Sequence, residues 1–163
     1  MMVKFKHIIL LICVVGCIAA CKKDVSMDDS YDPTPQFKAD TAAIGAYVKA
    51  NNIPVTKDAS GIYYQIIAPG SGNVTYLTST LITADYEGKL LNGTIFDSTK
   101  GTPISFKLGN VILGWQFGIQ KIQKGGMIRL IIPSYFAYGT KSPSTLVPAN
   151  SVLDFTITLT DVQ

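Results

Sequence analysis

Hydrophobic and polar residues alternate along several stretches in the second half of the chain, and this alternation predicts strands with one buried face and one wet, polar face. The last stretch shows the pattern most clearly, with aspartate and threonine residues between the apolar positions Leu153, Phe155, Ile157 and Leu159. An earlier stretch is followed by Asn92-Gly93, a pair typical of tight hairpin turns. The sequence therefore predicts four or five antiparallel strands.

One short stretch between these strands has helical spacing instead. Trp115, Ile119 and Ile122 recur at i, i+4 and i+7, which places them on one face of a helix, and Gly125-Gly126 is expected to end it. A sheet must curl over such a helix to bury its apolar stripe. The predicted fold is therefore α+β: a curled antiparallel sheet, or half-barrel, wrapped around one short helix.

A second helix, short and amphipathic, is predicted closer to the N-terminus, from about Phe37 to Asn51, with a connector that continues to residue 58. Asp40 or Thr41 is expected to cap its start, because their side-chain oxygens can accept hydrogen bonds from the first backbone amides of a helix. Two roles are open for residues 37–58. They pack against the domain, or they form an arm for dimerisation or for contact with client proteins.

Residues 1–20 have the pattern of an export signal: two lysines near the start and then an uncharged stretch of thirteen residues, Ile8 to Ala20. That stretch is shorter than the roughly 20 apolar residues that span a bilayer as a helix, which argues against a transmembrane segment. It ends in Ile18-Ala19-Ala20-Cys21, which resembles the lipobox of bacterial lipoproteins. The resemblance implies cleavage before Cys21 and lipidation of its thiol. An ordinary secretory signal with an incidental cysteine is the alternative.

Residues 21–36 are acidic, contain two prolines and have few apolar side chains, so they are expected to form a flexible tether. Together with the leader, this segment predicts a protein of the bacterial cell envelope that is anchored to a membrane through lipid at Cys21. The outer membrane is favoured over the inner membrane.

The composition after the leader excludes several kinds of chemistry. Removing the two lysines of residues 1–20 from fourteen basic residues leaves twelve against eleven acidic ones, so no excess of positive charge favours nucleic acid as a partner. The single histidine, His7, lies in the leader. Without histidine, neither a catalytic triad nor a histidine-based zinc site can form, and we expect neither a metal nor another cofactor. An enzyme of this composition must catalyse a reaction that needs no strong acid, base or nucleophile.

Residues 59–163 contain a series of short motifs in a fixed order: Asp85-Tyr86-Glu87-Gly88-Lys89-Leu90, Asn92-Gly93, Phe96-Asp97-Ser98, Phe106-Lys107-Leu108-Gly109, Val111-Ile112-Leu113-Gly114-Trp115, Ile132-Pro133-Ser134-Tyr135-Phe136-Ala137-Tyr138-Gly139 and Val147-Pro148-Ala149-Asn150-Ser151. As an ordered set, with their spacing, these motifs resemble the FKBP-type peptidyl-prolyl cis-trans isomerases. The likeness identifies residues 59–163 as an isomerase domain with an FKBP-like half-barrel.

The resemblance also implies a site, a shallow aromatic pocket that takes the proline ring of a polypeptide. Trp115 is expected to form its floor, and its walls are expected to be Tyr86, Phe96, Val111, Ile112 and Phe155. The backbone N–H of Ile112 is expected to bind a substrate carbonyl. Polar contacts at the rim are assigned to Asp97 and the Tyr138 hydroxyl. The residues expected to cover the bound peptide are Leu146 and Val147.

Two departures from the family pattern concern specificity. Ile104, assigned to substrate binding, stands where many members of the family have an aromatic residue, and the loop of residues 140–145 lacks the usual glycines. Both departures affect the expected choice of clients and the affinity for macrolide ligands, which the family binds in this pocket.

The expected function is peptidyl-prolyl isomerisation that assists the folding of exported or envelope proteins. The alternative is a chaperone or peptide-binding module of the same fold without enzymatic activity. Every expected pocket residue lies beyond Tyr64, so residues 22–58 are expected to be dispensable for isomerisation of short peptides.

Overall fold

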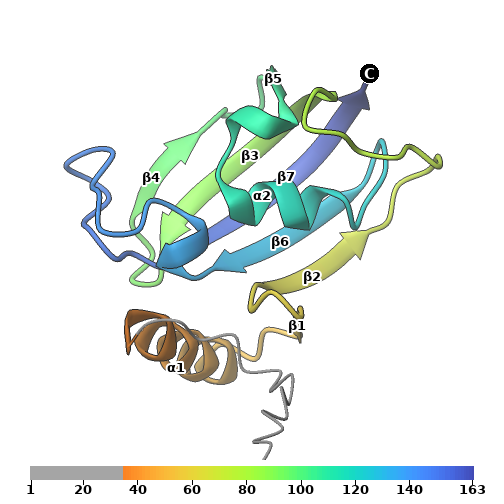
Figure 1. Ribbon diagram of the computed structural model, residues 1–163. Coiled ribbons are helices and arrows are strands. Elements are labelled where there is room, and N and C mark those ends of the chain that lie inside the picture. The colour runs from red at the N-terminus through yellow and green to blue at the C-terminus, as the bar shows by residue number, and fades with distance from the viewer. Residues whose placement is uncertain (1–34) are drawn as a thin grey trace, which may run out of the picture.

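The computed structural model describes residues 35–163, and within this range seven strands form one antiparallel sheet (Figure 1). The strands follow the order β1-β2-β6-β7-β3-β4 across the sheet, and β5 pairs with β3 beyond the end of β4. In chain order the elements are α1 Pro35–Ala50, β1 Thr56–Lys57, β2 Tyr63–Ala68, β3 Leu81–Leu90, β4 Ile95–Ser98, β5 Ile104–Lys107, the 3-10 turn η1 Leu108–Asn110, α2 Leu113–Ile119, β6 Met127–Ile132, the 3-10 turn η2 Ser134–Phe136, and β7 Leu153–Val162.

The predicted fold class is confirmed, and three details differ from the prediction. The sheet has more strands than the four or five expected, partly because the two-residue β1 is too short to show an alternation. Helix α2 ends at Ile119, so Ile122 lies past its last turn, although it is still buried in the core at 1% exposure. The Gly125-Gly126 pair therefore does not end the helix. It belongs to the turn into β6, where Gly125 has a φ of 79°.

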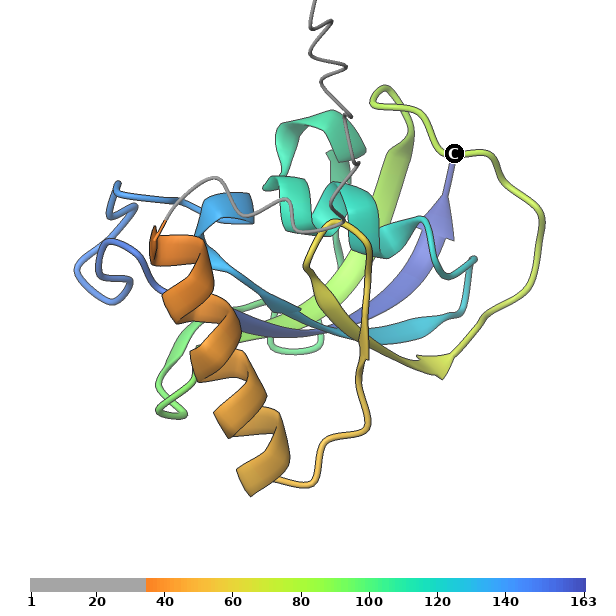
Figure 2. The same cartoon turned by 60° about the horizontal axis from the view of Figure 1, so that its bottom comes forward.

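The concave face of the sheet wraps around α2, and the main core lies between them (Figure 2). Helix and sheet approach closely because two glycines, Gly114 and Gly118, face β6. A Cβ atom at Gly114 would lie 2.4 Å from the Ile132 side chain, and one at Gly118 would lie 2.4 Å from that of Leu130. Both of these β6 residues are fully buried. The missing side chains on α2 are therefore what allows the helix to lie this low on the sheet.

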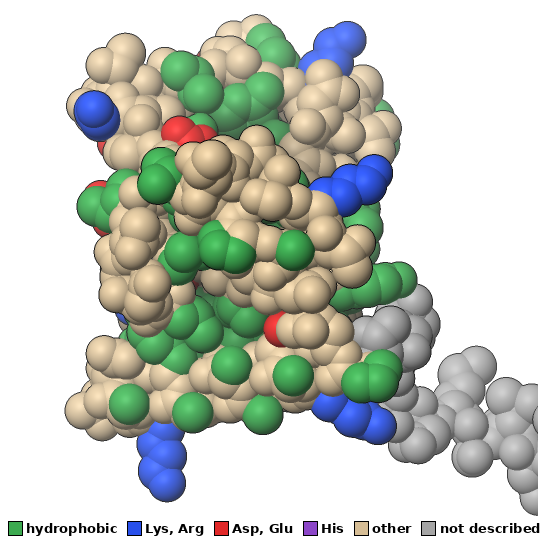
Figure 3. Space-filling view, turned by 90° about the vertical axis from the view of Figure 1, so that its left-hand side faces the viewer, with side chains coloured by type: hydrophobic (Ala, Val, Ile, Leu, Met, Phe, Trp, Pro, Cys, Tyr) green, Lys and Arg blue, Asp and Glu red, His purple; other side chains and the backbone are tan. Residues whose placement is uncertain are grey.

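Helix α1 packs against the opposite, convex face of the sheet (Figure 2). Two roles were open for this helix, and the structure describes the first, packing against the domain. Ile44 of α1 is buried against Ile131 and Val152. Strand β6 thus contributes to two cores, because Ile131 faces α1 while its neighbours face α2. A hollow of about 360 Å³ remains between α1 and the β3–β4 hairpin, and hydrophobic side chains are visible in it (Figure 3).

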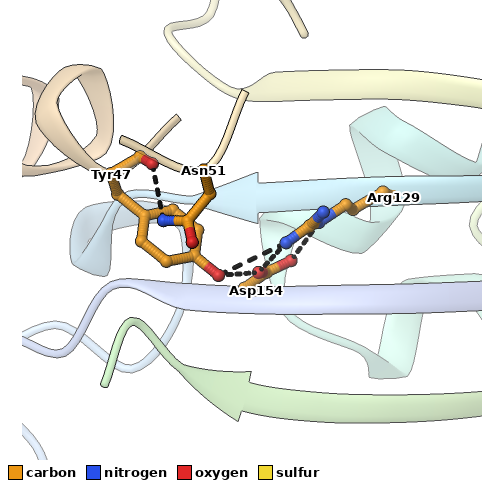
Figure 4. Close-up of polar contacts among 4 residues, drawn as sticks. All are labelled: Tyr47, Asn51, Arg129 and Asp154. Carbon is orange, nitrogen blue, oxygen red and sulfur yellow. Dashed lines mark hydrogen bonds and ion pairs between the residues drawn. The ribbon is translucent and has the colours of Figure 1, made fainter. Parts of the chain in front are cut away.

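An ion pair between a partly buried arginine and a fully buried aspartate on this convex face also contacts α1 (Figure 4). Arg129 on β6 forms two hydrogen bonds with Asp154 on β7, of 2.9 Å from Nε and 2.6 Å from one terminal nitrogen. The Tyr47 hydroxyl of α1 donates to the same carboxylate at 2.9 Å. The expectation that the polar face of the last strand is wet is therefore wrong at Asp154, whose side chain is fully buried because α1 covers this end of the sheet.

Helix α1 begins at Pro35, two residues before the predicted start, and proline suits this first position because it has no N–H to leave unpaired. The prediction that Asp40 or Thr41 caps the helix is wrong, because both lie within its second turn. Asp40 is 3% exposed and accepts hydrogen bonds from Ser134, almost a hundred residues away. Its side chain thus serves a tertiary contact that preferences for capping residues cannot reveal.

The predicted leader, the predicted lipidation site at Cys21 and nearly all of the predicted tether, residues 21–36, lie outside the described residues. Between residues 35 and 163, no helix combines the length and the apolar character needed to cross a bilayer.

The close approach of α2 to β6 can be tested by adding a single methyl group. We expect Gly114→Ala to lower the free energy of unfolding by about 1–3 kcal/mol, because the stiff, buried Ile132 side chain must move. Gly45→Ala is the matched control. Gly45 lies inside α1 with nothing within 4 Å of its Cβ position, so the same change there should raise stability by about 0.5–1 kcal/mol. Urea unfolding followed by circular dichroism measures both, and a Gly114→Ala chain as stable as Gly45→Ala would contradict the packing described.

Candidate functional site

A cavity of about 300 Å³ opens between α2, β3, β5 and the long loop that follows β6. Most of its lining is aromatic or aliphatic, with one carboxylate and one amide. The lining residues are Tyr86, Asp97, Ile104, Phe106, Asn110, Val111, Ile112, Trp115, Tyr138 and Phe155.

The base of the cavity is a cluster of rings around Trp115, which is 3% exposed. The rings of Tyr86 and Phe155 meet the indole edge-on at centroid distances of 5.1 and 5.3 Å, and Phe106 lies tilted against it at 5.6 Å. Edge-to-face contacts of this kind are the favoured geometry for aromatic pairs. They fix Trp115 as a rigid floor that excludes water from beneath any ligand.

The polar groups of the cavity lie at its rim, centred on Asp97 of β4. The Tyr86 hydroxyl donates a hydrogen bond to Asp97 Oδ2 at 2.7 Å. Burial, together with the hydrogen bond and charge of Asp97, raises the pKa of Tyr86 well above its usual value of 10. The pKa of Tyr138 is raised as well, by burial and then by the negative charge of Asp97. Both hydroxyls therefore stay protonated, and able to donate, throughout the physiological range.

The backbone around Tyr86 is held by Thr99, which follows β4. The Tyr86 N–H donates to the Thr99 hydroxyl at 2.8 Å, and the Thr99 N–H donates to the Tyr86 carbonyl at 3.0 Å. The Thr99 hydroxyl in turn donates to Asp85. Neither Thr99 nor Asp85 was expected to matter at the site, because they support a lining residue without reaching the cavity.

Ile112 immediately precedes α2. Its carbonyl accepts the amides of Trp115 and Gln116 at 3.0 and 3.2 Å, which starts the helix. The Gln116 side chain donates to the Val111 carbonyl at 2.8 Å and holds the approach to the helix in place. The Ile112 N–H itself makes no hydrogen bond to any of residues 35–163, so it is available to a ligand carbonyl.

The family model for the FKBP-type peptidyl-prolyl cis-trans isomerases matches residues 74–160, more than half of the chain and all of the cavity lining. The chain belongs to this family. The isomerase FkpA of Escherichia coli K12 is 40% identical over 111 residues, which are 67% of this chain and 40% of that protein. The isomerase Mip of Coxiella burnetii is 34% identical over 122 residues, 72% of this chain and 53% of that protein.

Solved structures of the family have the same fold. The crystal structure of FkpA from Escherichia coli superposes with a TM-score of 0.64 at 34% identity, covering 78% of this chain and 63% of that one. A peptidyl-prolyl isomerase from Pseudomonas syringae gives a TM-score of 0.66 at 30% identity, covering 81% of this chain and 98% of that one. Our chain spans less than half the length of the FkpA proteins that it matches in sequence.

Most of the residues predicted from the family resemblance lie together around the cavity: Tyr86, Asp97, Ile104, Val111, Ile112, Trp115, Tyr138 and Phe155. Phe96 is not in the lining. It packs edge-on against Phe155 at 5.5 Å and supports that ring from behind. Ile104 is 46% exposed, so it forms an open part of the wall.

Leu146 and Val147 were expected to cover a bound peptide, but neither residue lines the cavity. Val147 is 2% exposed and belongs to the main core, and its carbonyl accepts a hydrogen bond from the Ser142 hydroxyl at 2.6 Å. Leu146 is 51% exposed and is absent from the lining. The loop therefore buries its valine in the main core, and neither residue lines the cavity.

Two lining residues were missed, Phe106 and Asn110. Phe106 could have been found from the sequence, because it lies two residues after Ile104 on one strand and so faces the same side. Asn110 is in the η1 turn, where no periodic pattern indicates which way a side chain points. Between residues 35 and 163, no cluster of histidine, cysteine or carboxylate residues is placed to hold a metal ion.

Gly88 of β3 provides a test of how tightly the rings are packed. A Cβ atom there would lie 2.5 Å from the Phe155 ring and 2.8 Å from that of Phe96. We expect Gly88→Ala to displace both rings and to admit water to Trp115, the single tryptophan of the chain. Trp115 fluorescence should shift to longer wavelength, and Gly45→Ala should leave it unchanged. Identical spectra for the parent and Gly88→Ala would contradict the close packing of the Phe155 and Phe96 rings against Gly88.

Proposed function

We propose that the protein is a peptidyl-prolyl cis-trans isomerase that accelerates the folding of proteins in the bacterial cell envelope, and that the cavity over Trp115 is its active site. The observation that carries the proposal is the cavity itself, an apolar aromatic floor with a few hydrogen-bonding groups in its lining. Its substrates are proline-containing segments of other polypeptides.

The chemistry of X-Pro rotation suits such a site. The barrier, about 18–20 kcal/mol, arises because amide resonance must be broken, and no covalent bond is made or cleaved. The twisted imide has less charge separation than the planar one, so an apolar cavity that removes water from the carbonyl favours it over the ground state. Each tenfold acceleration needs about 1.36 kcal/mol of this preference.

The proposed roles of the residues follow from their positions. Trp115, Tyr86 and Phe155 enclose the proline ring and exclude water. The Ile112 N–H donates to a substrate carbonyl, and Asp97 with the Tyr138 hydroxyl contacts the flanking peptide at the rim.

Macrolide ligands of the family are proposed to occupy the same cavity. The half-exposed Ile104 offers them less ring contact than an aromatic residue would.

Exchange of a short X-Pro peptide, followed by NMR with the purified full chain, tests the proposal. We expect Tyr86→Ala to lower kcat/KM more than about tenfold, because it opens the floor to water. Asp97→Asn should lower it less than about tenfold, since the amide oxygen still accepts the Tyr86 hydrogen bond. The rate should stay nearly constant between about pH 5.5 and 8.5. The raised pKa values of Tyr86 and Tyr138 keep both hydroxyls protonated below pH 10, and deprotonation removes their contribution only above it.

A bell-shaped pH profile centred near neutrality, or loss of all activity in Asp97→Asn while Tyr86→Ala is tolerated, would contradict catalysis by desolvation and indicate acid–base chemistry. Binding of the peptide without any acceleration of exchange would indicate a chaperone or binding module instead.

We further propose that the chain is a lipoprotein, lipidated at Cys21 and anchored to a membrane of the envelope, with the outer membrane favoured. The support is the sequence Ile18-Ala19-Ala20-Cys21 at the end of the leader. Several acyl chains anchor a protein stably, whereas one gives only marginal binding.

The anchor is tested by cell fractionation of the full chain expressed in a bacterium. Cys21→Ser is expected to give an unprocessed or released product, because the acceptor thiol is absent. Cys17→Ser, which removes a leader cysteine outside the lipobox-like sequence, should fractionate with membranes as the parent does. A Cys21→Ser chain that loses its leader and still fractionates with membranes would contradict the lipoprotein proposal.

A further inference from the structure

One buried carboxylate joins the N-terminal helix to the turn that carries Tyr138. Asp40 of α1 is 3% exposed, and its Oδ2 accepts two hydrogen bonds from Ser134, one from the backbone N–H at 2.7 Å and one from the hydroxyl at 2.6 Å. Gln36 donates to the other oxygen at 2.6 Å. A buried carboxylate held in this way resists displacement, because movement would leave it without hydrogen bonds in a site that water does not reach.

Ser134 in turn holds the backbone on both sides of Tyr138. Its carbonyl accepts the N–H of Ala137 at 3.0 Å and the N–H of Gly139 at 2.8 Å. Tyr138 lies between these two residues, and its side chain lines the cavity. A continuous path of hydrogen bonds therefore leads from Asp40 through Ser134 to Ala137 and Gly139, the two neighbours of the rim residue Tyr138.

Ring packing supports the same turn. Phe37, three residues before Asp40 on α1, meets Phe136 edge-on at 6.0 Å and Tyr135 at 6.4 Å. Its ring fits because Gly61 has no side chain, since a Cβ there would lie 2.4 Å from the ring. Phe37 and Asp40 thus dock the first half of α1 against η2, away from the ion pair that Tyr47 contacts at the other end of the helix.

We propose that Asp40 is a positioning residue for X-Pro isomerisation, which holds Ser134 so that Tyr138 keeps its place in the wall of the cavity. The inference rests on the proposed function. It departs from the expectation that residues 22–58 are dispensable, which took account only of residues that reach the pocket. Asp40 acts entirely through Ser134 and the turn, and it does not touch the substrate.

The test compares Asp40→Ala in two backgrounds of the full chain, with exchange of an X-Pro peptide as the readout. In the parent chain we expect kcat/KM to fall about tenfold, because the rim hydroxyl is misplaced. In a Tyr138→Phe chain the same substitution should change kcat/KM less than about twofold, since the hydroxyl that Asp40 positions is already absent. Tyr47→Phe is the control. It removes a hydrogen bond of α1 that does not involve Ser134, and it should leave kcat/KM unchanged.

Asp40→Asn provides a milder variant, because its amide oxygen can still accept the Ser134 N–H. We expect a loss of about threefold in the parent chain and none in the Tyr138→Phe chain. If Asp40→Ala does not fold, Asp40→Asn allows the same comparison of kcat/KM between the parent and the Tyr138→Phe chain.

Hydrogen exchange supplies a readout that does not depend on activity. In Asp40→Ala or Asp40→Asn, the amides of Ala137 and Gly139 should exchange faster, whereas the amide of Ile157, in the centre of the sheet, should not change. Equal losses of kcat/KM in both backgrounds, or unchanged exchange at the two turn amides, would overturn the inference. Faster exchange in a chain whose parent shows no isomerisation would support the positioning by Asp40 and contradict the proposed function.

Discussion

The close contact between α2 and β6 is the constraint on which the rest of the molecule depends. Gly114 and Gly118 let the helix backbone rest directly on Ile132 and Leu130. Because the helix lies so low, Trp115 is held at the bottom of the curled sheet, where the rings of three neighbours meet it. A side chain at either glycine would raise the helix and with it the floor of the cavity. The depth of the site and its exclusion of water thus depend on the absence of side chains at Gly114 and Gly118.

The two central strands, β6 and β7, carry buried side chains on both faces of the sheet. On β7, Phe155 points into the cavity while its neighbour Asp154 points to the convex face, where it pairs with Arg129 and accepts a hydrogen bond from Tyr47. Because Asp154 is fully buried, removing Arg129 would leave its charge uncompensated at a cost of about 3–5 kcal/mol. The N-terminal helix is therefore part of the domain, and through Asp40 it reaches the turn at the cavity rim.

The chemistry of the cavity matches the sparse set of reactive groups in the chain. The site offers rings, one carboxylate, one amide, two tyrosine hydroxyls and the backbone N–H of Ile112, which makes no hydrogen bond to residues 35–163. For a reaction that rotates a bond without breaking one, such a set is sufficient. In the proposed reaction, rigid apolar walls would remove water and a few fixed donors would orient the peptide.

The sequence by itself determined the fold class, the longer strands and the presence of the central helix, and its resemblance to the family indicated most of the cavity lining. Alternation of period two at residues 153–159 reflects one strand face against a core, and the ordered motifs predicted Tyr86 and Trp115 for the pocket, whose cavity both residues line. Only the tertiary structure decided the burial of Asp154, the contact of Asp40 with Ser134 and the burial of Val147. Each of these depends on a partner far away in the chain, and local patterns record which face a residue occupies but not what the fold brings against it.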